Sequence, residues 1–273
     1  MTRSLAVFLP LLVAYGATWP WIWGSWHFRE AYYEHCPIVV GLAVVMVWWR
    51  RDRLASIAPA VEPRGWWLLG PGLGLHLVGA SLVIDSLSAA SLTLSVPGAV
   101  LLAEGRGRCR ALLPILGLLP FIIPMPLVVS GQVAFELKEF AVTAGLWIAN
   151  LVGAGATRTG ASIGFTDLDG TLLVADPCSG LRSLVALTTL GYALAFFLGE
   201  QRGPRRWVIL AASAPIAILS NAFRIAAICL IARAFGVETA KGAGHETANV
   251  IAWTLDLAAL IGLDALLTKR RRQ

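Results

Sequence analysis

Residues 207–235 read WVILAASAPIAILSNAFRIAAICLIARAF and contain two charged side chains, Arg224 and Arg233. A helix that crosses the apolar core of a bilayer needs about 20 predominantly apolar residues. This stretch is longer than that, and it lacks the two-residue alternation of a barrel strand. It therefore predicts a membrane-spanning helix that carries an arginine inside it.

Similar apolar stretches recur along the whole chain. Of its 273 residues, 57% are hydrophobic and 14% are charged, and the mean hydropathy is +0.72. Soluble domains carry about 25% charged residues. We therefore expect an all-α polytopic membrane protein with about eight transmembrane helices. The predicted spans are 5–23, 37–49, 66–84, 87–103, 111–130, 179–199, 207–235 and 248–267.

The basic residues predict the orientation of these spans, because most of them lie in alternate loops and at the two ends. The positive-inside rule then places both termini in the cytoplasm of a multi-pass protein of the inner (cytoplasmic) membrane. This placement accounts for much of the net charge of +6, so we expect no nucleic-acid partner. The residues are Arg3, Arg50, Arg51, Arg53, Arg64, Arg106, Arg108, Arg110, Arg202, Arg205, Arg206, Lys269, Arg270, Arg271 and Arg272.

The segment between the fifth and sixth spans then faces the extracytoplasmic side. Residues 132–151 combine apolar bulk with charged positions and predict a helix that lies in the membrane interface. Residues 157–175 alternate small polar and apolar side chains around Asp169-Gly170, which predicts a short β-hairpin. This segment ends directly at a cysteine.

Cys178 is the strongest candidate for chemistry. Asp176 suits a helix N-cap and Pro177 suits the first helical position, so we expect Cys178 in the first turn. The amide groups of a helix N-terminus favour a thiolate. Arg182, four residues later, would share its face. The alternative is a structural cysteine beside an interfacial arginine.

The four cysteines fit no zinc or Cys-x-x-Cys pattern, and we expect neither a metal nor a cofactor. They are Cys36, Cys109, Cys178 and Cys229.

Two further polar sites lie in the last two spans. Arg224 is placed in the outer part of the seventh span, with Asn221 on the same helical face, and such charges usually face a protein interior. The alternative is an arginine that snorkels outward. His245 begins the eighth span, and Asn249 lies one turn further on. Because no second histidine follows, a zincin helix is excluded, and the alternative is an ordinary loop histidine.

The topology brings Cys178, Arg224 and His245 to one face from three different helices. A thiol, an imidazole and a fixed cation are the groups that acyl transfer requires.

Three segments of the chain resemble, in order and spacing, the signature segments of the exosortase/archaeosortase family, and the resemblance covers roughly residues 110–260. Many members carry Glu-Ala before the cysteine, where this chain has Asp176-Pro177. The segments are Cys178-Ser179-Gly180-Leu181-Arg182, Asn221-Ala222-Phe223-Arg224 and Gly244-His245-Glu246, and the Pro-rich Ile123-Pro124-Met125-Pro126 matches as well.

The resemblance implies a membrane cysteine peptidase or transpeptidase that forms a thioester. Cys178 would be the nucleophile, Arg224 the substrate or transition-state cation and His245 the general acid/base. The implied substrates are exported proteins with a C-terminal motif, a transmembrane helix and a basic tail. The supporting residues are Ser179, Gly180, Arg182, Asn221 and Asn249.

On this resemblance the chain is one integral membrane domain, 1–273. It comprises a four-helix part at 1–110, a catalytic part at 111–268 and a basic cytoplasmic tail at 269–273.

Two other functions remain open from the sequence. A transporter or lipid-binding protein would place Arg224 and Asn221 in a substrate path, although no paired halves are evident. A thiol–disulfide oxidoreductase would need Cys36 as the resolving cysteine. Membrane lipid is a partner in each case.

Overall fold

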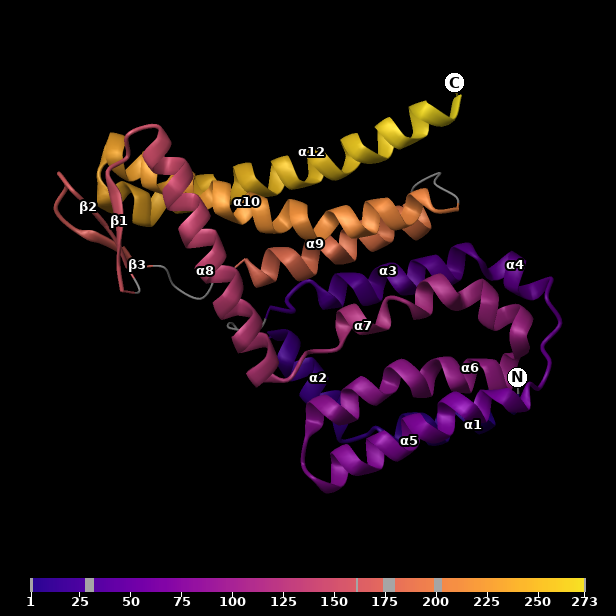
Figure 1. Cartoon of the computed structure of the whole chain (residues 1–273). Helices are drawn as coiled ribbons and strands as arrows, with labels where there is room; N and C mark the ends of the chain where they lie inside the picture. The colour runs from indigo at the N-terminus through magenta and orange to yellow at the C-terminus, as the bar shows by residue number, and fades with distance from the viewer. Residues whose placement is uncertain (1, 28–31, 161, 174–179, 199–202, 273) are drawn as a thin grey trace. The chain divides into compact units, whose positions relative to one another are not determined.

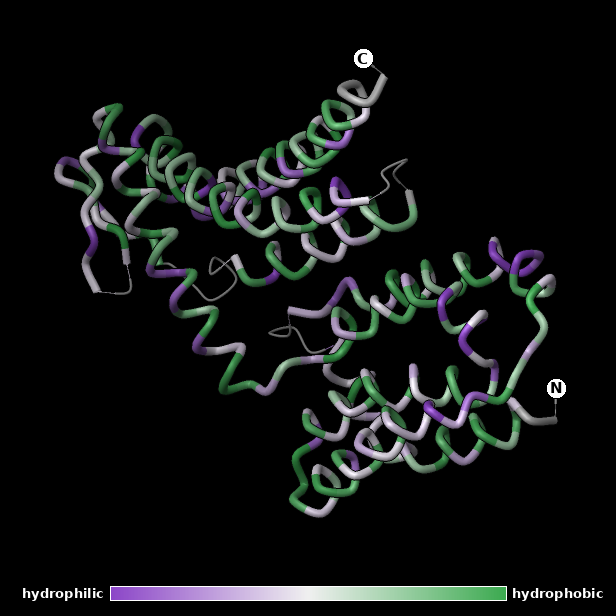
Figure 2. Tube along the Cα trace, turned by 45° about the vertical axis from the view of Figure 1, so that its right-hand side comes forward, coloured by the Kyte–Doolittle hydropathy of each residue, from purple (hydrophilic) through white to green (hydrophobic). Residues whose placement is uncertain are grey.

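The computed structural model describes residues 2–27, 32–160, 162–173, 180–198 and 203–272, and most of these residues are helical (Figure 1). The chain forms two compact units, Met1–Leu127 and Val128–Gln273. The predicted N-terminal part, 1–110, lies within the first unit. Hydrophobic residues dominate the helices of both units (Figure 2).

The first unit is entirely helical in its described residues. A short 3₁₀ turn, Pro63–Gly65, precedes the fifth helix. The helices are α1 (Thr2–Ala14), α2 (Thr18–His27), α3 (Cys36–Trp49), α4 (Arg51–Ala55), α5 (Trp66–Ser81), α6 (Asp85–Leu116) and α7 (Leu119–Ile122).

Helices α5 and α6 pack closely because glycines line their contact. A Cβ atom at Gly98 would lie 2.4 Å from the backbone nitrogen of Leu69, and one at Gly72 would lie 2.4 Å from the Ser95 hydroxyl. Beside this contact, the hydroxyl of Tyr15 lies 2.5 Å from the Ser91 hydroxyl and 2.8 Å from that of Ser95. The first unit therefore contains a buried hydrogen-bonded network.

Three helical segments are long and apolar enough to cross a membrane, counted over the described residues: Asp85–Ile122, Arg205–Phe235 and Val237–Thr268. The pair Ser4–Ala14 and Thr18–His27, bent by 68°, would make a fourth. The protein is therefore a helical membrane protein, as predicted. The number eight stays a prediction, since α3 and the helix that follows residue 180 are apolar but shorter.

Helix α6 consists of two helical segments that meet at a sharp break at Gly105, between the predicted spans 87–103 and 111–130. Gly105 adopts φ 79° and ψ 175°, which interrupts the helical backbone. The fifth span ends at the predicted Pro-rich segment, because the chain between Ile122 and Leu127 is not helical.

The second unit begins with the helix predicted for the membrane interface and contains the only sheet among the described residues. Its elements are α8 (Leu127–Leu151), β1 (Ala156–Thr159), β2 (Ser162–Phe165), β3 (Thr171–Leu173), α9 (Leu181–Ala193), the π-helical turn Leu194–Leu198, α10 (Arg205–Phe235), α11 (Val237–Thr239), the π-helical turn Ala240–Gly244 and α12 (His245–Arg272).

The predicted β-hairpin around Asp169-Gly170 is present as β2 and β3, and a third strand, β1, which was not predicted, completes an antiparallel sheet in the order β1-β2-β3. Ile163 of β2 pairs with Arg158 of β1 and with Leu172 of β3. Gly160, with φ 61°, occupies the turn that the sequence analysis missed.

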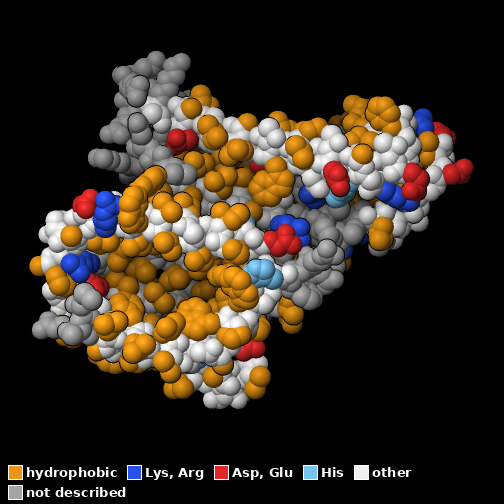
Figure 3. All heavy atoms as spheres, turned by 180° about the vertical axis from the view of Figure 1, so that it is seen from behind, with side chains coloured by type: hydrophobic (Ala, Val, Ile, Leu, Met, Phe, Trp, Pro, Cys, Tyr) orange, Lys and Arg blue, Asp and Glu red, His pale blue; other side chains and the backbone are white. Residues whose placement is uncertain are grey.

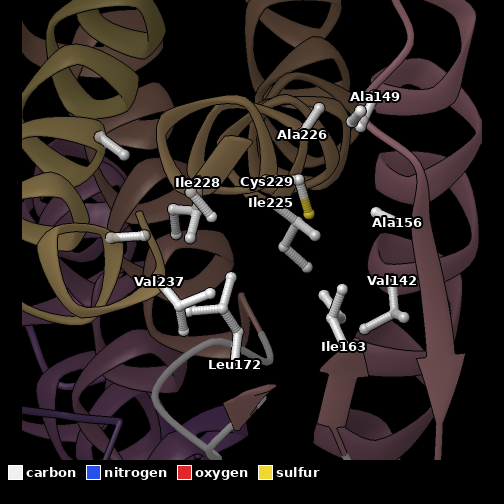
Figure 4. Packing of buried hydrophobic residues seen from close by; sticks show 14 of the residues in the cluster. Val142, Ala149, Ala156, Ile163, Leu172, Ile225, Ala226, Ile228, Cys229 and Val237 are labelled. Atoms are coloured by element: carbon white, nitrogen blue, oxygen red, sulfur yellow. The ribbon is translucent and has the colours of Figure 1, made fainter. Parts of the chain in front are cut away.

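The sheet packs one face against α8 and α10. In Figure 4, Ile163 lies beside Val142 of α8, and Leu172 lies beside Val237 of α11, with Ile225 of α10 between them. All five side chains are buried. The sheet thus covers the C-terminal half of α10, the half that carries the polar candidates.

Polar contacts tie β1 to α8 at both ends of the strand. The side chain of Asn150 bonds to both backbone groups of Ala156, at 2.8 and 2.9 Å. Arg158 donates two hydrogen bonds, of 2.5 and 2.6 Å, to the carboxylate of Glu139. This bond from Arg158 holds the pKa of Glu139 below its usual range.

Gly145 sets the contact between α8 and α10, since a Cβ atom there would lie 2.8 Å from Cβ of Ile225 and 2.9 Å from the Ala222 carbonyl. We predict that Gly145→Val lowers the thermal unfolding temperature in detergent, because overpacking costs about 1–3 kcal/mol. Gly131→Val is the matched control in the same helix, where a Cβ atom meets nothing within 4 Å. Equal melting of the two variants would contradict this contact.

Candidate active site

Helix α10 carries Asn221 and Arg224 one turn apart on a buried face. Their exposed fractions are 5% and 7%. The guanidinium of Arg224 donates from Nη1 to Oδ1 of Asn249 on α12, at 3.0 Å. The arginine therefore points into the protein, toward α12, and does not snorkel away from it.

The turn between α10 and α12 brings His245 to the same place. Gly236, with φ 87°, ends α10, and the chain returns through α11 and a π-helical turn. A Cβ atom at Gly244 would lie 2.8 Å from Ile231 and 2.9 Å from the Thr239 carbonyl, so only glycine permits this approach. His245 then opens α12 at a partly buried position.

Asn249 joins the two sites. Its amide nitrogen lies 3.3 Å from Nδ1 of His245, while its oxygen accepts the bond from Arg224. The structure thus brings Arg224, Asn249 and His245 into one chain of polar contacts. Each of the three was a candidate from the sequence, and Asn249 holds the central position.

Asp256 belongs to the same face of α12, although the sequence analysis gave it no role. It is 3% exposed and accepts a hydrogen bond from Ser220 of α10. It also interacts electrostatically with Arg224. The signal that could have found it is spacing, because it follows Asn249 by two helical turns.

Cys178 and Ser179 lie outside the described residues, as do Asp176 and Pro177. The described chain resumes at Gly180, which is buried and has φ 82°. A Cβ atom on Gly180 would lie 2.5 Å from Nδ2 of Asn221. Gly180, two residues after Cys178 in the sequence, therefore packs directly against the helix that carries Arg224.

The prediction that Cys178 lies in the first turn of a helix falls outside the described residues. Helix α9 begins at Leu181, and Gly180 before it has a left-handed backbone that no α-helix continues through. The physical reason is the contact with Asn221, which requires a residue without a side chain at 180. Arg182 lies in the first turn of α9.

The remaining cysteines are buried free thiols, Cys36, Cys109 and Cys229. The thiol of Cys36 donates to the carbonyl of Phe121 at 3.5 Å. In the part of the chain that the structure describes, no three His, Cys, Asp or Glu side chains gather as a metal site would need.

A comparison with protein families identifies this chain's relatives. The family model described as Transmembrane exosortase (Exosortase_EpsH) matches residues 23–262. That range includes all three segments that carry Gly180, Arg224 and His245. Neither the search of curated proteins nor the search of solved structures gave a match.

Gly180→Ala tests the contact with Asn221. We predict a lower unfolding temperature for two reasons: a left-handed backbone costs a residue with a side chain about 1–2 kcal/mol, and the new methyl group overlaps Asn221. Gly203→Ala is the matched control, because Gly203 has φ 71° and open space around it. Adding Asn221→Ser to Gly180→Ala should restore much of the extra loss, whereas equal losses in the two alanine variants would argue against the contact.

Proposed function

The chain belongs to the transmembrane exosortase family, and we propose that it is a membrane cysteine peptidase or transpeptidase that cleaves the C-terminal sorting signal of exported proteins. The observation that carries this proposal is the Arg224–Asn249–His245 contact chain, with the end of the cysteine segment packed beside it. The substrates would carry a short motif, a transmembrane helix and a basic tail.

The proposed topology has eight crossings in the inner membrane, with both termini in the cytoplasm and the site on the outer side. The eight predicted spans overlap helices of the described residues, although the first is bent between α1 and α2 and the fifth is interrupted at residues 123–126. The small sheet supports the outward placement, since β1 exposes polar and charged side chains and the sheet covers the same half of α10. A substrate helix beside the bundle would then present its motif level with Cys178.

Acyl transfer would begin with the sulfur of Cys178. Its proton passes to the imidazole of His245, and the sulfur forms a bond to the carbonyl carbon of the scissile peptide. The carbonyl oxygen takes the electron pair, and the guanidinium of Arg224 stabilises this oxyanion. When the C–N bond breaks, the leaving nitrogen takes the proton back from His245. Water or an acceptor amine then resolves the thioester.

Asn249 would couple the cation to the base. While Arg224 occupies the Asn249 oxygen, the asparagine turns its amide nitrogen toward Nδ1 of His245. A ring that takes up a proton at Nε2 carries a proton on Nδ1 and needs an acceptor there. Asn249 supplies that acceptor if Arg224 moves to the substrate oxygen and the amide rotates. Substrate binding would thus prepare the base.

Asp256 would balance the charge of Arg224. A guanidinium inside a membrane helix costs about 2.5–3.5 kcal/mol on insertion scales. When ionised, Asp256, which accepts a hydrogen bond from Ser220 and interacts electrostatically with Arg224, would offset part of that cost.

Cys178→Ala should abolish cleavage while the protein still inserts and melts normally, because it removes the nucleophile. The assay is co-expression with a reporter that carries the motif, helix and basic tail of an exported protein from the same genome. The thioester itself is tested by mass spectrometry of Cys178 before and after hydroxylamine, which cleaves thioesters.

Cys109→Ala is the matched control, since it removes another free thiol of the chain and should leave cleavage intact. Full processing by Cys178→Ala would end the peptidase proposal. Such a result would favour a transporter or lipid-binding protein with Arg224 and Asn221 in its path.

Asn249→Leu should lower turnover about 10²-fold, the lower limit for well-placed proton transfer, and flatten the pH dependence of turnover. Both effects follow because His245 loses the partner that sets its proton position. Thr247→Leu, two residues away on an exposed face of α12, is the control. Unchanged turnover and an unchanged pH profile in Asn249→Leu would refute the coupling.

A further inference from the structure

An apolar groove lies in the first unit, between α3 on one side and α6 and α7 on the other. Its volume is about 790 Å³, and almost all of its lining is aliphatic. Figure 3 shows a hollow surrounded by hydrophobic side chains, with basic and acidic side chains near its edge. Val44 and Trp48, which line it, are 64% and 58% exposed. Such a surface faces lipid in a membrane protein.

Two arginines occupy one end of this groove. Arg108 is held in place by hydrogen bonds to the Ile57 carbonyl and to Glu104, at 2.8 and 2.5 Å. Arg51 stacks over the ring of Trp48, 4.3 Å from its centroid, and its side chain is 53% exposed. Its nearest acid is Asp52 at 3.7 Å, an exposed pair of low strength.

The surroundings of this end carry a net positive charge. Segments 50–64 and 104–110 contain seven arginines against three acids, Asp52, Glu62 and Glu104. Two of these acids are already engaged, since Glu104 pairs with Arg108 and Glu62 pairs with Arg106 at 2.7 Å. An anion at the basic end of the groove would therefore lie among more arginine side chains than carboxylates, and the excess positive charge would attract it.

We infer that the groove binds one anionic phospholipid of the membrane, with an acyl chain along α3 and the phosphate at Arg51. Guanidinium groups bind phosphate oxygens through paired hydrogen bonds. Basic pockets between membrane helices bind anionic lipid head groups in this way. The same charge disfavours the transmembrane helix of a sorting signal, because its basic tail would lie against these arginines. The inference does not depend on the proposed peptidase activity.

The test is native mass spectrometry of the full-length protein, purified in mild detergent and mixed with dioleoyl phosphatidylglycerol or dioleoyl phosphatidylcholine. We expect the wild type to retain phosphatidylglycerol several-fold more than phosphatidylcholine. Arg51→Glu should abolish this preference, and Arg51→Lys should keep part of it. Arg53→Glu, the same charge change at an exposed residue that does not line the groove, should keep it fully.

Two further variants test whether an acyl chain occupies the apolar part of the groove. Ala43→Trp and Val47→Trp should fill the groove and lower retention of both lipids while melting like the wild type. Glycerol 3-phosphate, which has the anion without the chain, should not displace bound lipid. Equal loss in Arg51→Glu and Arg53→Glu would overturn the site in favour of general surface attraction. Displacement by a synthetic apolar helix with a basic tail would overturn it in favour of a substrate groove.

Discussion

The burial of one guanidinium constrains the second unit more than any other interaction. Arg224 is 7% exposed in the middle of an apolar helix. A buried charge without hydrogen-bond partners or an opposite charge would be energetically costly there. Asn249 accepts the hydrogen bond of Arg224 and Asp256 interacts with Arg224 electrostatically, and both come from α12. Because these two residues are two turns apart on one helical face, they fix how far α12 slides along α10 and which face it turns inward. His245 is positioned as a consequence.

Glycines make that arrangement sterically possible. Helix α10 is the central element, and α8, the start of α9 and the start of α12 each approach it at a residue without a side chain: Gly145, Gly180 and Gly244. In lipid there is little hydrophobic drive to bring helices together, so close backbone approach and polar contacts supply the association. The sheet adds a covered apolar cluster at the C-terminal half of α10. Packing and polar contacts therefore act on the same stretch of helix.

The sequence predicts the helices well because long apolar runs leave few other structures in a membrane. It predicts β1 poorly, since Thr157, Arg158 and Thr159 are exposed and only Ala156 is buried. The left-handed backbone of Gly180 before α9 was not foreseeable for a different reason: the contact between Gly180 and Asn221 that requires a glycine there is tertiary. The contact between His245 and Asn249 was foreseeable from their i, i+4 spacing, whereas the contact of Asn249 with Arg224 joins two helices. The involvement of Asp256 depends on which face of α12 meets α10, and one helix alone does not reveal that.

The polar cluster holds α10 to α12 and would also carry the chemistry. Substitutions that remove its side chains therefore do not separate an effect on the reaction from an effect on folding. Removing Arg224 would take the cation away from the buried Asp256, so loss of activity would follow from misfolding as readily as from a missing cation. Cys178 differs, because it precedes α9 in the sequence and belongs to neither α10 nor α12. A variant of the sulfur alone changes the reaction and spares the framework. The cysteine therefore separates a peptidase from a transporter more cleanly than the arginine, even though the arginine is the residue on which the fold depends.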